Sequence, residues 1–331
     1  MTTLLVLGGS GYIGRHITRA VAAQGHTVVV ASRQPRPEPL AQTRALDVLH
    51  EPSLVQALAG VDVVVNATTG SGAVIAQGAQ VLARAMQQAG VRHLVHLSSQ
   101  AVYGAQEGVL TESAPLQASL GWYGQAKIDA EHTVQAWAQQ GGNAVVLRPG
   151  CVSGPGSPLW DQRLAQWLRW GQLGDLGSAG DGWSNLVDVQ DVAQAVAVAV
   201  QRLQQHGSGL HDVFNLAALD APRWNGYFAD LALSIGAVPL RRIGRRQLWL
   251  QTRLLGLPLK VAERLGARLG LNTQALPPGM PPSLLGVFQQ HIKLEFAKAQ
   301  SELGLPLRYP APRASRPQPE EQEPRHGRPL A

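Results

Sequence analysis

The sequence predicts an α/β fold built on a doubly wound parallel sheet, and three features of roughly the first 150 residues indicate this. Short apolar runs rich in β-branched residues alternate with segments whose apolar residues recur at spacings of three and four, as in helices with one buried face. The runs contain few polar residues, which is typical of parallel strands covered on both faces. A glycine-rich turn joins the first run to the first helical segment. We therefore expect a βαβαβ arrangement with helices on both faces of the sheet.

The individual elements follow from these patterns. Helical periodicity covers Ile13–Gln24 and Ala73–Ala89. Strands are expected at Thr3–Leu7, Thr27–Ala31, Val61–Asn66, His93–Leu97 and Ala144–Leu147.

The glycine-rich turn has the spacing of a phosphate-binding loop. In LLVLGGSGYIG, Gly8, Gly11 and Gly14 follow a predicted strand and precede a predicted helix. Such glycines permit a tight turn, let the backbone approach a pyrophosphate and let helix and strand pack closely. The amides that open the helix, here near Tyr12 and Ile13, then face the phosphates. An ordinary βα turn is the alternative, but the position favours a Rossmann-type dinucleotide-binding domain.

The end of the second strand bears on which dinucleotide is bound. An acidic side chain there would accept a hydrogen bond from the ribose 2′-hydroxyl of NAD. This strand instead runs into Ser32 and Arg33, and the first acid beyond it is Glu38. Because Arg can form two parallel hydrogen bonds to phosphate oxygens, we expect NADP(H) in preference to NAD(H). The alternative is that Arg33 only faces solvent.

A catalytic set is predicted at Ser99, Tyr123 and Lys127. The last two are four residues apart in GWYGQAK, and so lie on one face of a predicted helix. Hydride transfer to a carbonyl leaves an alkoxide that needs a proton, and a Tyr hydroxyl supplies it better when a cation stabilises the phenolate. Ser98 and Ser99 end a strand, where such sheets bind ligands, and Ser99 is the expected donor to the substrate oxygen. A solvated Tyr and Lys and a turn-capping Ser pair are the structural alternatives.

Four segments in this order, HLSSQAVYG, YGQAK, LRPGCVSGPG and SNLVDVQDVAQA, resemble the motifs of the extended short-chain dehydrogenase/reductase family, of the NAD-dependent epimerase/dehydratase type. The resemblance covers about residues 3–220, and more loosely FAKAQSELGL near the C-terminus. It implies that Ser99 polarises the carbonyl, that Tyr123 is the acid/base and that Lys127 is its partner, also donating to the nicotinamide ribose. Members commonly form homodimers through the helix that bears this Tyr, so the resemblance implies a homodimer.

The resemblance also implies further cofactor contacts. Asp47 and Val48 would lie by the adenine, and Asn66 and Ala67 near the phosphates and ribose. Pro149 and Gly150 would lie near the nicotinamide amide.

Two departures from the family pattern narrow the function. Dehydratases of the family carry an acidic pair just after the polarising residue, where this chain has Gln100 and Ala101, so sugar dehydration is not expected. Many nucleotide-sugar enzymes have a substrate-touching Asn where this chain has Cys151, which we interpret as a packed side chain rather than a reactive thiol.

Three functions remain open. The first is an NAD(P)-dependent oxidoreductase that acts on a ketone or secondary alcohol. The second is a nucleotide-sugar epimerase with tightly held NAD, and the third is a non-catalytic dinucleotide-binding protein.

The domain organisation is expected to be unequal. We assign 1–150 to the dinucleotide-binding domain, with contributions returning at about 184–218, and 151–308 mainly to a smaller α/β substrate-binding domain. In it, Leu159–Trp170 places Trp160, Leu164, Trp167 and Leu168 on one helical face, as a small core would. The Pro-rich, charged residues 309–331 are expected to be a disordered tail.

A second insertion in this domain, at about Trp224–Leu271, contains Arg241, Arg242, Arg245 and Arg246 followed by a Leu-rich amphipathic stretch. It could be a lid, a membrane-surface helix or an oligomer contact, and we favour a lid or packing helix over peripheral membrane contact.

The composition of the chain argues against several classes of partner and site. The net charge of +6 suits a phosphorylated cofactor, but no basic helix interleaved with aromatics occurs in the first 300 residues, so nucleic acid is not expected as a partner. The chain has a single Cys and no charged segment before its first predicted strand, which predicts a cytoplasmic protein. It has no apolar run of about 18 residues, so no transmembrane segment is expected. The spacing of the 10 His residues predicts no metal site.

Overall fold

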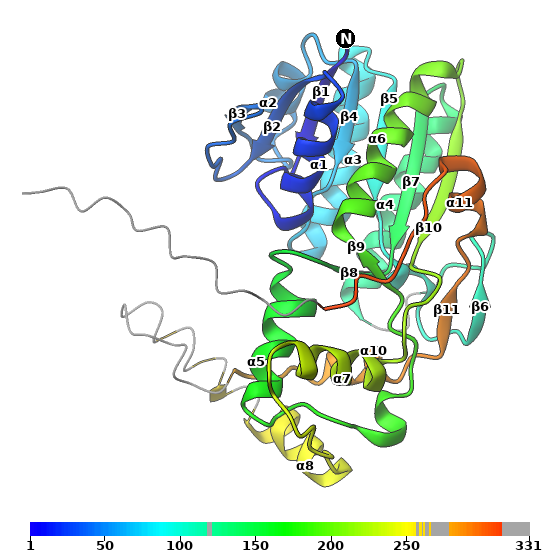
Figure 1. Ribbon diagram of the computed structural model, residues 1–331. Coiled ribbons are helices and arrows are strands. Elements are labelled where there is room, and N and C mark those ends of the chain that lie inside the picture. Colours follow the sequence, from blue (N-terminus) through cyan, green and yellow to red (C-terminus); the bar gives the residue numbers. More distant parts are fainter. Residues whose placement is uncertain (118–120, 256–257, 260, 262–264, 266–277, 313–331) are drawn as a thin grey trace, which may run out of the picture.

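A computed structural model of the chain describes residues 1–312 apart from 118–120, 256–257, 260, 262–264 and 266–277. A seven-stranded sheet with the order β10-β7-β5-β4-β1-β2-β3 forms one part of it (Figure 1), and every neighbouring pair is parallel. Its strands are β1 (Thr3–Leu7), β2 (Thr27–Ser32), β3 (Gln42–Ala45), β4 (Val63–Asn66), β5 (His93–Leu97), β7 (Asn143–Pro149) and β10 (His211–Leu216).

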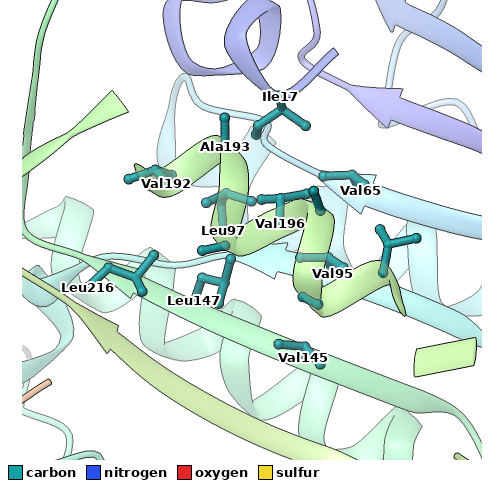
Figure 2. Close-up of a cluster of buried hydrophobic side chains, with 14 of the residues drawn as sticks. Ile17, Val65, Val95, Leu97, Val145, Leu147, Val192, Ala193, Val196 and Leu216 are labelled. Carbon is teal, nitrogen blue, oxygen red and sulfur yellow. The ribbon is translucent and has the colours of Figure 1, made fainter. Parts of the chain in front are cut away.

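Helices cover both faces of this sheet because alternate strand residues point to opposite sides. Leu4 and Val6 of β1 belong to a core that also contains residues of α1 (Tyr12–Ala23), α6 (Val189–Gln205) and α11 (Ala297–Leu303). Figure 2 shows part of this core, where Ile17, Val192 and Val196 lie near strand residues. Leu5 and Leu7 face the other core, which is closed by α2 (Glu51–Ala57), α3 (Gly72–Ala89) and α4 (Trp122–Gln139).

The predicted fold class is therefore confirmed. Each of the five expected strands is present, with ends that differ by no more than two residues. The sequence did not indicate β3, because its residues Gln42–Ala45 are exposed along the edge of the sheet and carry no apolar pattern.

The remaining elements form what we call the C-terminal lobe, made of the described residues within 150–187 and 218–291, which lies beyond one end of the strands in Figure 1. Its core is aromatic, with Trp224 in contact with Phe228 and Phe288. Two short parallel strand pairs connect it to the sheet: β6 (Gly108–Leu110) with β11 (Ile292–Leu294), and β8 (Cys151–Ser153) with β9 (Leu186–Asp188). The described helices of the lobe include α5 (Leu164–Arg169), α7 (Trp224–Ser234), α8 (Arg245–Trp249) and α10 (Ser283–Phe288).

The Trp-rich segment forms a core, as expected. Trp167 and Leu164 are buried, and Trp160 lies 5.1 Å from Trp224 between ring centroids. The segment begins as a π-helical turn, Pro158–Arg163, before it continues as α5. Tyr309, where a tail was expected to begin, donates a hydrogen bond to Asp230 Oδ2 at 3.0 Å, and residues 313–331 lie outside the described residues. None of the described helices is long and apolar enough to cross a bilayer.

A buried ion pair joins α4 to the sheet. Arg148 on β7 binds the carboxylate of Glu131 on α4 through Nη2 at 2.6 Å and Nε at 3.0 Å, and both side chains are almost fully buried. Arg148 Nη1 also donates to the hydroxyl of Tyr103 at 2.8 Å. Tyr103 lies in the 3₁₀ turn Gln100–Tyr103 and donates to Asn215 on β10 at 2.7 Å. One guanidinium therefore connects four elements.

Replacing Arg148 with Met should lower the free energy of unfolding by about 3–5 kcal/mol, because Glu131 is left buried without its partner. Denaturant unfolding measures the change. Arg84→Met is the matched control, since the Arg84–Glu51 pair is exposed and should contribute no more than about 1 kcal/mol. Equal losses in the two variants would contradict a special role for the buried pair.

Candidate active site

The predicted site residues meet at the carboxyl edge of the sheet, where all seven parallel strands end. The strand order reverses between β1 and β4, which is where open α/β sheets bind ligands. The turn after β1 lies against the turn after β4, since a Cβ on Gly8 would come 2.7 Å from Ala67 O. Ser10 in the first turn is hydrogen-bonded to Ser32 after β2, with 2.8 Å between the hydroxyl oxygens.

The glycine turn fits a dinucleotide phosphate. Gly8 has a φ of +77°, and a Cβ on Gly14 would lie 2.3 Å from Gly8 O, so side chains are excluded at both positions. Gly11 is exposed and has no side chain to cap the first amides of α1, whereas Ser71 caps α3. Backbone N–H groups at an uncapped helix start are the donors that bind phosphate oxygens.

The residues beside this turn have defined contacts. The hydroxyl of Tyr12 donates a hydrogen bond to Gly154 O at 3.1 Å, which connects the start of α1 to the loop after β8. Burial raises the pKa of this hydroxyl. Ile13 is half-buried against the α1 and α6 core. Arg15 Nη1 donates to Ser10 O at 3.0 Å and braces the turn. Arg33 is exposed at the end of β2, with no acidic side chain between it and Glu38.

The expected adenine and ribose residues lie on the same edge. Asp47 follows β3, is exposed and accepts a hydrogen bond from Leu49 N at 3.0 Å, while the side chain of Val48 is buried against α3. Asn66 is buried, and its Oδ1 accepts hydrogen bonds from Thr68 N and Thr68 Oγ1. The amide of Asn66 is thus used to form the turn that presents Ala67.

The hydroxyl of Ser99 lies close enough to Tyr123 to act on the pKa of its phenol. Ser99 follows β5 and also caps the turn Gln100–Tyr103, where its Oγ accepts from Ala101 N at 3.2 Å. Tyr123 lies in the first turn of α4. Burial raises the pKa of Tyr123, and the Ser99 hydroxyl acts in the opposite direction. The phenol is therefore protonated at neutral pH.

Lys127 is the buried cation of the site. Its Nζ donates to Leu97 O at 2.6 Å and lies 6.0 Å from the centroid of the Tyr123 ring. Burial lowers the pKa of Lys127 to about 8, while the Glu131 carboxylate one turn later on α4 opposes the shift. Burial and the neighbouring Lys127 lower the pKa of His96 to about 3, so His96 stays neutral beside it. At neutral pH Lys127 is therefore mostly protonated, with a neutral His96 beside it.

Close approach of α4 to Ser99 depends on Gly124. A Cβ at this position would lie 2.7 Å from Ala101 O, so only glycine lets the helix pack directly on the turn after Ser99. Gly150 plays a similar part after β7, because a Cβ there would lie 2.0 Å from Asn185 O. With Pro149, it ends β7 on the same edge as the other site residues. The sequence pattern did not indicate Gly124, because its neighbour comes from a different segment.

Hydrogen-bonded side chains occupy the position where dehydratases of the family carry acidic residues. Gln100 Nε2 donates to Cys151 Sγ at 3.5 Å, and Gln100 Oε1 accepts from Asn185 Nδ2 at 2.9 Å. Cys151 is buried, which raises the pKa of its thiol and keeps it neutral. The described residues include no group of His, Cys, Asp or Glu that could hold a metal ion.

Comparison with known proteins identifies the family. The model of the NAD dependent epimerase/dehydratase family matches residues 4–217. The chain belongs to this family. As a member of the epimerase/dehydratase family it is an enzyme, an NAD(P)-dependent oxidoreductase or epimerase, which agrees with the resemblance in its motifs.

Relatives within this family include reductases. A 2'-dehydrokanamycin reductase from Streptomyces kanamyceticus is 32% identical over 63% of this chain, and the match spans 60% of that reductase. A 2-alkyl-3-oxoalkanoate reductase from Stenotrophomonas maltophilia (strain K279a) is 30% identical over 77% of this chain and 86% of its own length. A solved structure titled MoeE5 in complex with UDP-glucose and NAD shares the fold, with a TM-score of 0.67, 23% identity and coverage of 93% of this chain and 94% of that one.

Replacing Lys127 with Met should stabilise the fold at pH 7. Burying the charged Lys127, whose pKa is about 8 in the folded state instead of 10.5, destabilises the wild type by about 3 kcal/mol. The variant avoids this cost but loses the hydrogen bond to Leu97 O, which is worth about 1 kcal/mol. The free energy of unfolding of the variant should therefore be about 2 kcal/mol higher than that of the wild type. The unfolded state binds more protons between these two pKa values. The stability of the wild type therefore increases through this range, and the gain of the variant should shrink above about pH 8.

Denaturant unfolding at pH 7 and pH 10 measures both effects. Lys298→Met is the control, because Lys298 also donates to a backbone carbonyl, Val213 O, but is only half-buried. That variant should not gain stability. Destabilisation of the Lys127 variant at pH 7 would show that burial does not oppose this charge.

Proposed function

We propose that the chain is an NADP(H)-dependent reductase that converts a ketone to a secondary alcohol. The observation that carries this proposal is the arrangement of Tyr123 with the Ser99 hydroxyl beside it and with the buried Lys127 Nζ 6.0 Å from the centroid of its ring. A nicotinamide dinucleotide, when bound, supplies the hydride that the substrate carbon accepts. Gly8, Gly11 and Gly14 would hold its pyrophosphate, and the turns at Asn66–Ala67 and Pro149–Gly150 would lie along its ribose and nicotinamide.

The roles of the three side chains follow from their protonation. Ser99 Oγ would donate a hydrogen bond to the substrate oxygen, and Tyr123 Oη would transfer its proton to that oxygen as the carbon is reduced. Tyr123 is protonated at neutral pH, and burial favours this form further, so the free site is prepared to give a proton rather than to accept one. Lys127, charged at neutral pH, would stabilise the phenolate that remains.

The neighbours of Ser99 support reduction over dehydration. Removal of a sugar hydroxyl needs an acid close to the leaving group. The position after Ser99 is instead occupied by Gln100, which is hydrogen-bonded to Cys151 and Asn185. The relatives compared above are named as reductases, which also favours this reaction. An epimerase with retained NAD is the second candidate, favoured by the structural likeness to a UDP-glucose complex.

A homodimer that pairs α4 with its copy stays a prediction. Trp122 at the start of α4 is 62% exposed and would be near such an interface, whereas Ala126 and Ala130 are already buried against α3. The predicted cytoplasmic location is likewise kept as a proposal.

Replacing Tyr123 with Phe should reduce kcat for ketone reduction at least about 100-fold, because the proton donor is lost, and should leave NADPH affinity nearly unchanged. NADPH consumption with 3-oxo acids and keto sugars measures kcat, and cofactor fluorescence measures binding. Thr133→Ala is the control, since it removes a hydroxyl from the same helix that only bonds to Asp129 O.

Full activity in the Phe variant would refute the assignment of Tyr123. Purified protein that retains NAD and interconverts UDP-hexoses without net NADPH consumption would instead establish the epimerase.

Arg33→Ala should weaken NADPH binding about tenfold and leave NADH binding unchanged, because one charge-assisted hydrogen bond to a 2′-phosphate is lost. Arg36→Ala is the matched control in the same exposed loop. Ser32→Asp should reverse the preference, since a carboxylate repels the 2′-phosphate and accepts a hydrogen bond from a 2′-hydroxyl. Titration of cofactor fluorescence gives both dissociation constants. Tighter binding of NADH than of NADPH by the wild type would contradict the proposal.

A further inference from the structure

One end of the C-terminal lobe carries a surface on which Arg and exposed apolar side chains lie together. Three segments form it: 169–170 at the end of α5, 238–242 after α7, and α8 with the π-helical turn Leu250–Leu255. Asp175 N donates to Arg241 O at 2.9 Å, which holds the second segment against the loop after α5. In Figure 1, α8 lies at the extremity of the lobe, away from the seven-stranded sheet. We call this region the Arg/Trp surface.

Helix α8 and the turn after it have one inner and one outer face. Leu248 and Thr252 are buried, at 4% and 2% exposure. The outer face exposes Trp249 at 52% and Leu254 at 54%. Trp170 and Val238 on the neighbouring segments are similarly exposed, at 47% and 51%. The segment therefore packs through one side only, and its described outer side has large apolar groups in solvent. Residues 256–257, 260, 262–264 and 266–277 of the predicted insertion lie outside the described part.

Positive charge is concentrated in the same place. Residues 231–255 contain five Arg and no acidic residue, a formal charge of +5. The whole chain has a net charge of +6, so the rest of the sequence is close to balanced. All six Arg residues of the surface are exposed, and Asp175 approaches Arg242 only at 3.9 Å. These residues are Arg169, Arg241, Arg242, Arg245, Arg246 and Arg253.

We propose that the Arg/Trp surface docks on an anionic lipid bilayer. Basic side chains near an anionic leaflet each strengthen binding about fivefold, and Trp and Leu enter the interface between headgroups and acyl chains. This surface supplies both kinds of group from the same helical turns, with Arg245 and Arg246 next to Trp249 and Leu250 along a shared cavity of about 390 Å³. The sequence favoured a lid or packing helix here, but the exposure of the outer face points to an external partner.

Other occupants fit less well. A two-fold contact with a second copy would set Arg side chains against their own equivalents, which repel one another. A nucleic acid would attract the charge, but exposed Leu and Val side chains contribute little to binding a phosphate backbone. An anionic bilayer satisfies the charge and also removes the apolar groups from water.

Sedimentation of the full-length chain with vesicles tests the proposal. Phosphatidylcholine vesicles with about one third phosphatidylglycerol should bind the protein at least about tenfold more tightly than phosphatidylcholine alone. Binding should weaken strongly between about 0.1 M and 1 M salt, because the Debye length falls from about 10 to 3 Å. The double variant Arg245→Glu/Arg246→Glu should bind about 30-fold more weakly or worse. Trp249→Ser should lose the binding that persists at high salt.

The matched control is Arg19→Glu/Arg92→Glu, which changes net charge equally at exposed positions on the sheet domain and should bind like the wild type. Circular dichroism and NADPH binding should be unchanged in every variant, which separates loss of docking from loss of fold or function. The proposal is overturned if anionic vesicles do not bind, or if the control weakens binding as much as the surface variant does. It is also overturned if a DNA duplex competes with vesicles at lower concentration, or if the surface variant dissociates a dimer instead.

Discussion

The rest of the candidate site depends on the buried guanidinium of Arg148. It contacts Glu131 on α4, Tyr103 in the turn after Ser99 and, through Tyr103, Asn215 on β10. Tyr123 and Lys127 lie on the same helix as Glu131, so this network fixes the helix against the strand that ends at Pro149. A buried ion pair adds little stability compared with apolar packing, but it penalises any arrangement in which a partner is missing. Its main effect here is therefore to select one relative position of the helix, the turn and the strands.

Burial is the common cause of the electrostatic properties of the site. It raises the pKa of Tyr123 and lowers that of Lys127, in each case favouring the neutral form. Glu131 partly compensates at Lys127, so the Arg148 network also has an electrostatic effect on the candidate cation. The protein thus maintains a buried cation at a cost to stability. Such a cost is expected where activity requires a group that packing alone would exclude.

Much of the fold could be predicted from the sequence because its strands are apolar and buried. The edge strand Gln42–Ala45 could not, since exposed residues carry no pattern. The meeting of Ser99 with Tyr123 was predictable, because the end of a parallel strand and the start of the helix that precedes the next strand share one edge. The fit of Gly124 against Ala101 and the Arg148 network were not, since both depend on contacts between distant segments. The direction of the Tyr123 pKa shift could not be predicted either, because the degree of burial is a property of the folded site.

The chain passes between the sheet and the C-terminal lobe several times. In the described residues it crosses at 149–151, 184–188, 216–218 and 291–295, and hydrogen bonds such as Cys151 N to Asn185 O and Ala218 N to Leu186 O join these passages side by side. A hinge requires few covalent connections whose torsions can change together. Because these connecting segments are hydrogen-bonded to one another, rotation of the lobe as a rigid body would break several hydrogen bonds at once. Substrate entry and product exit are therefore expected to involve local loop and side-chain rearrangement rather than rotation of the whole lobe.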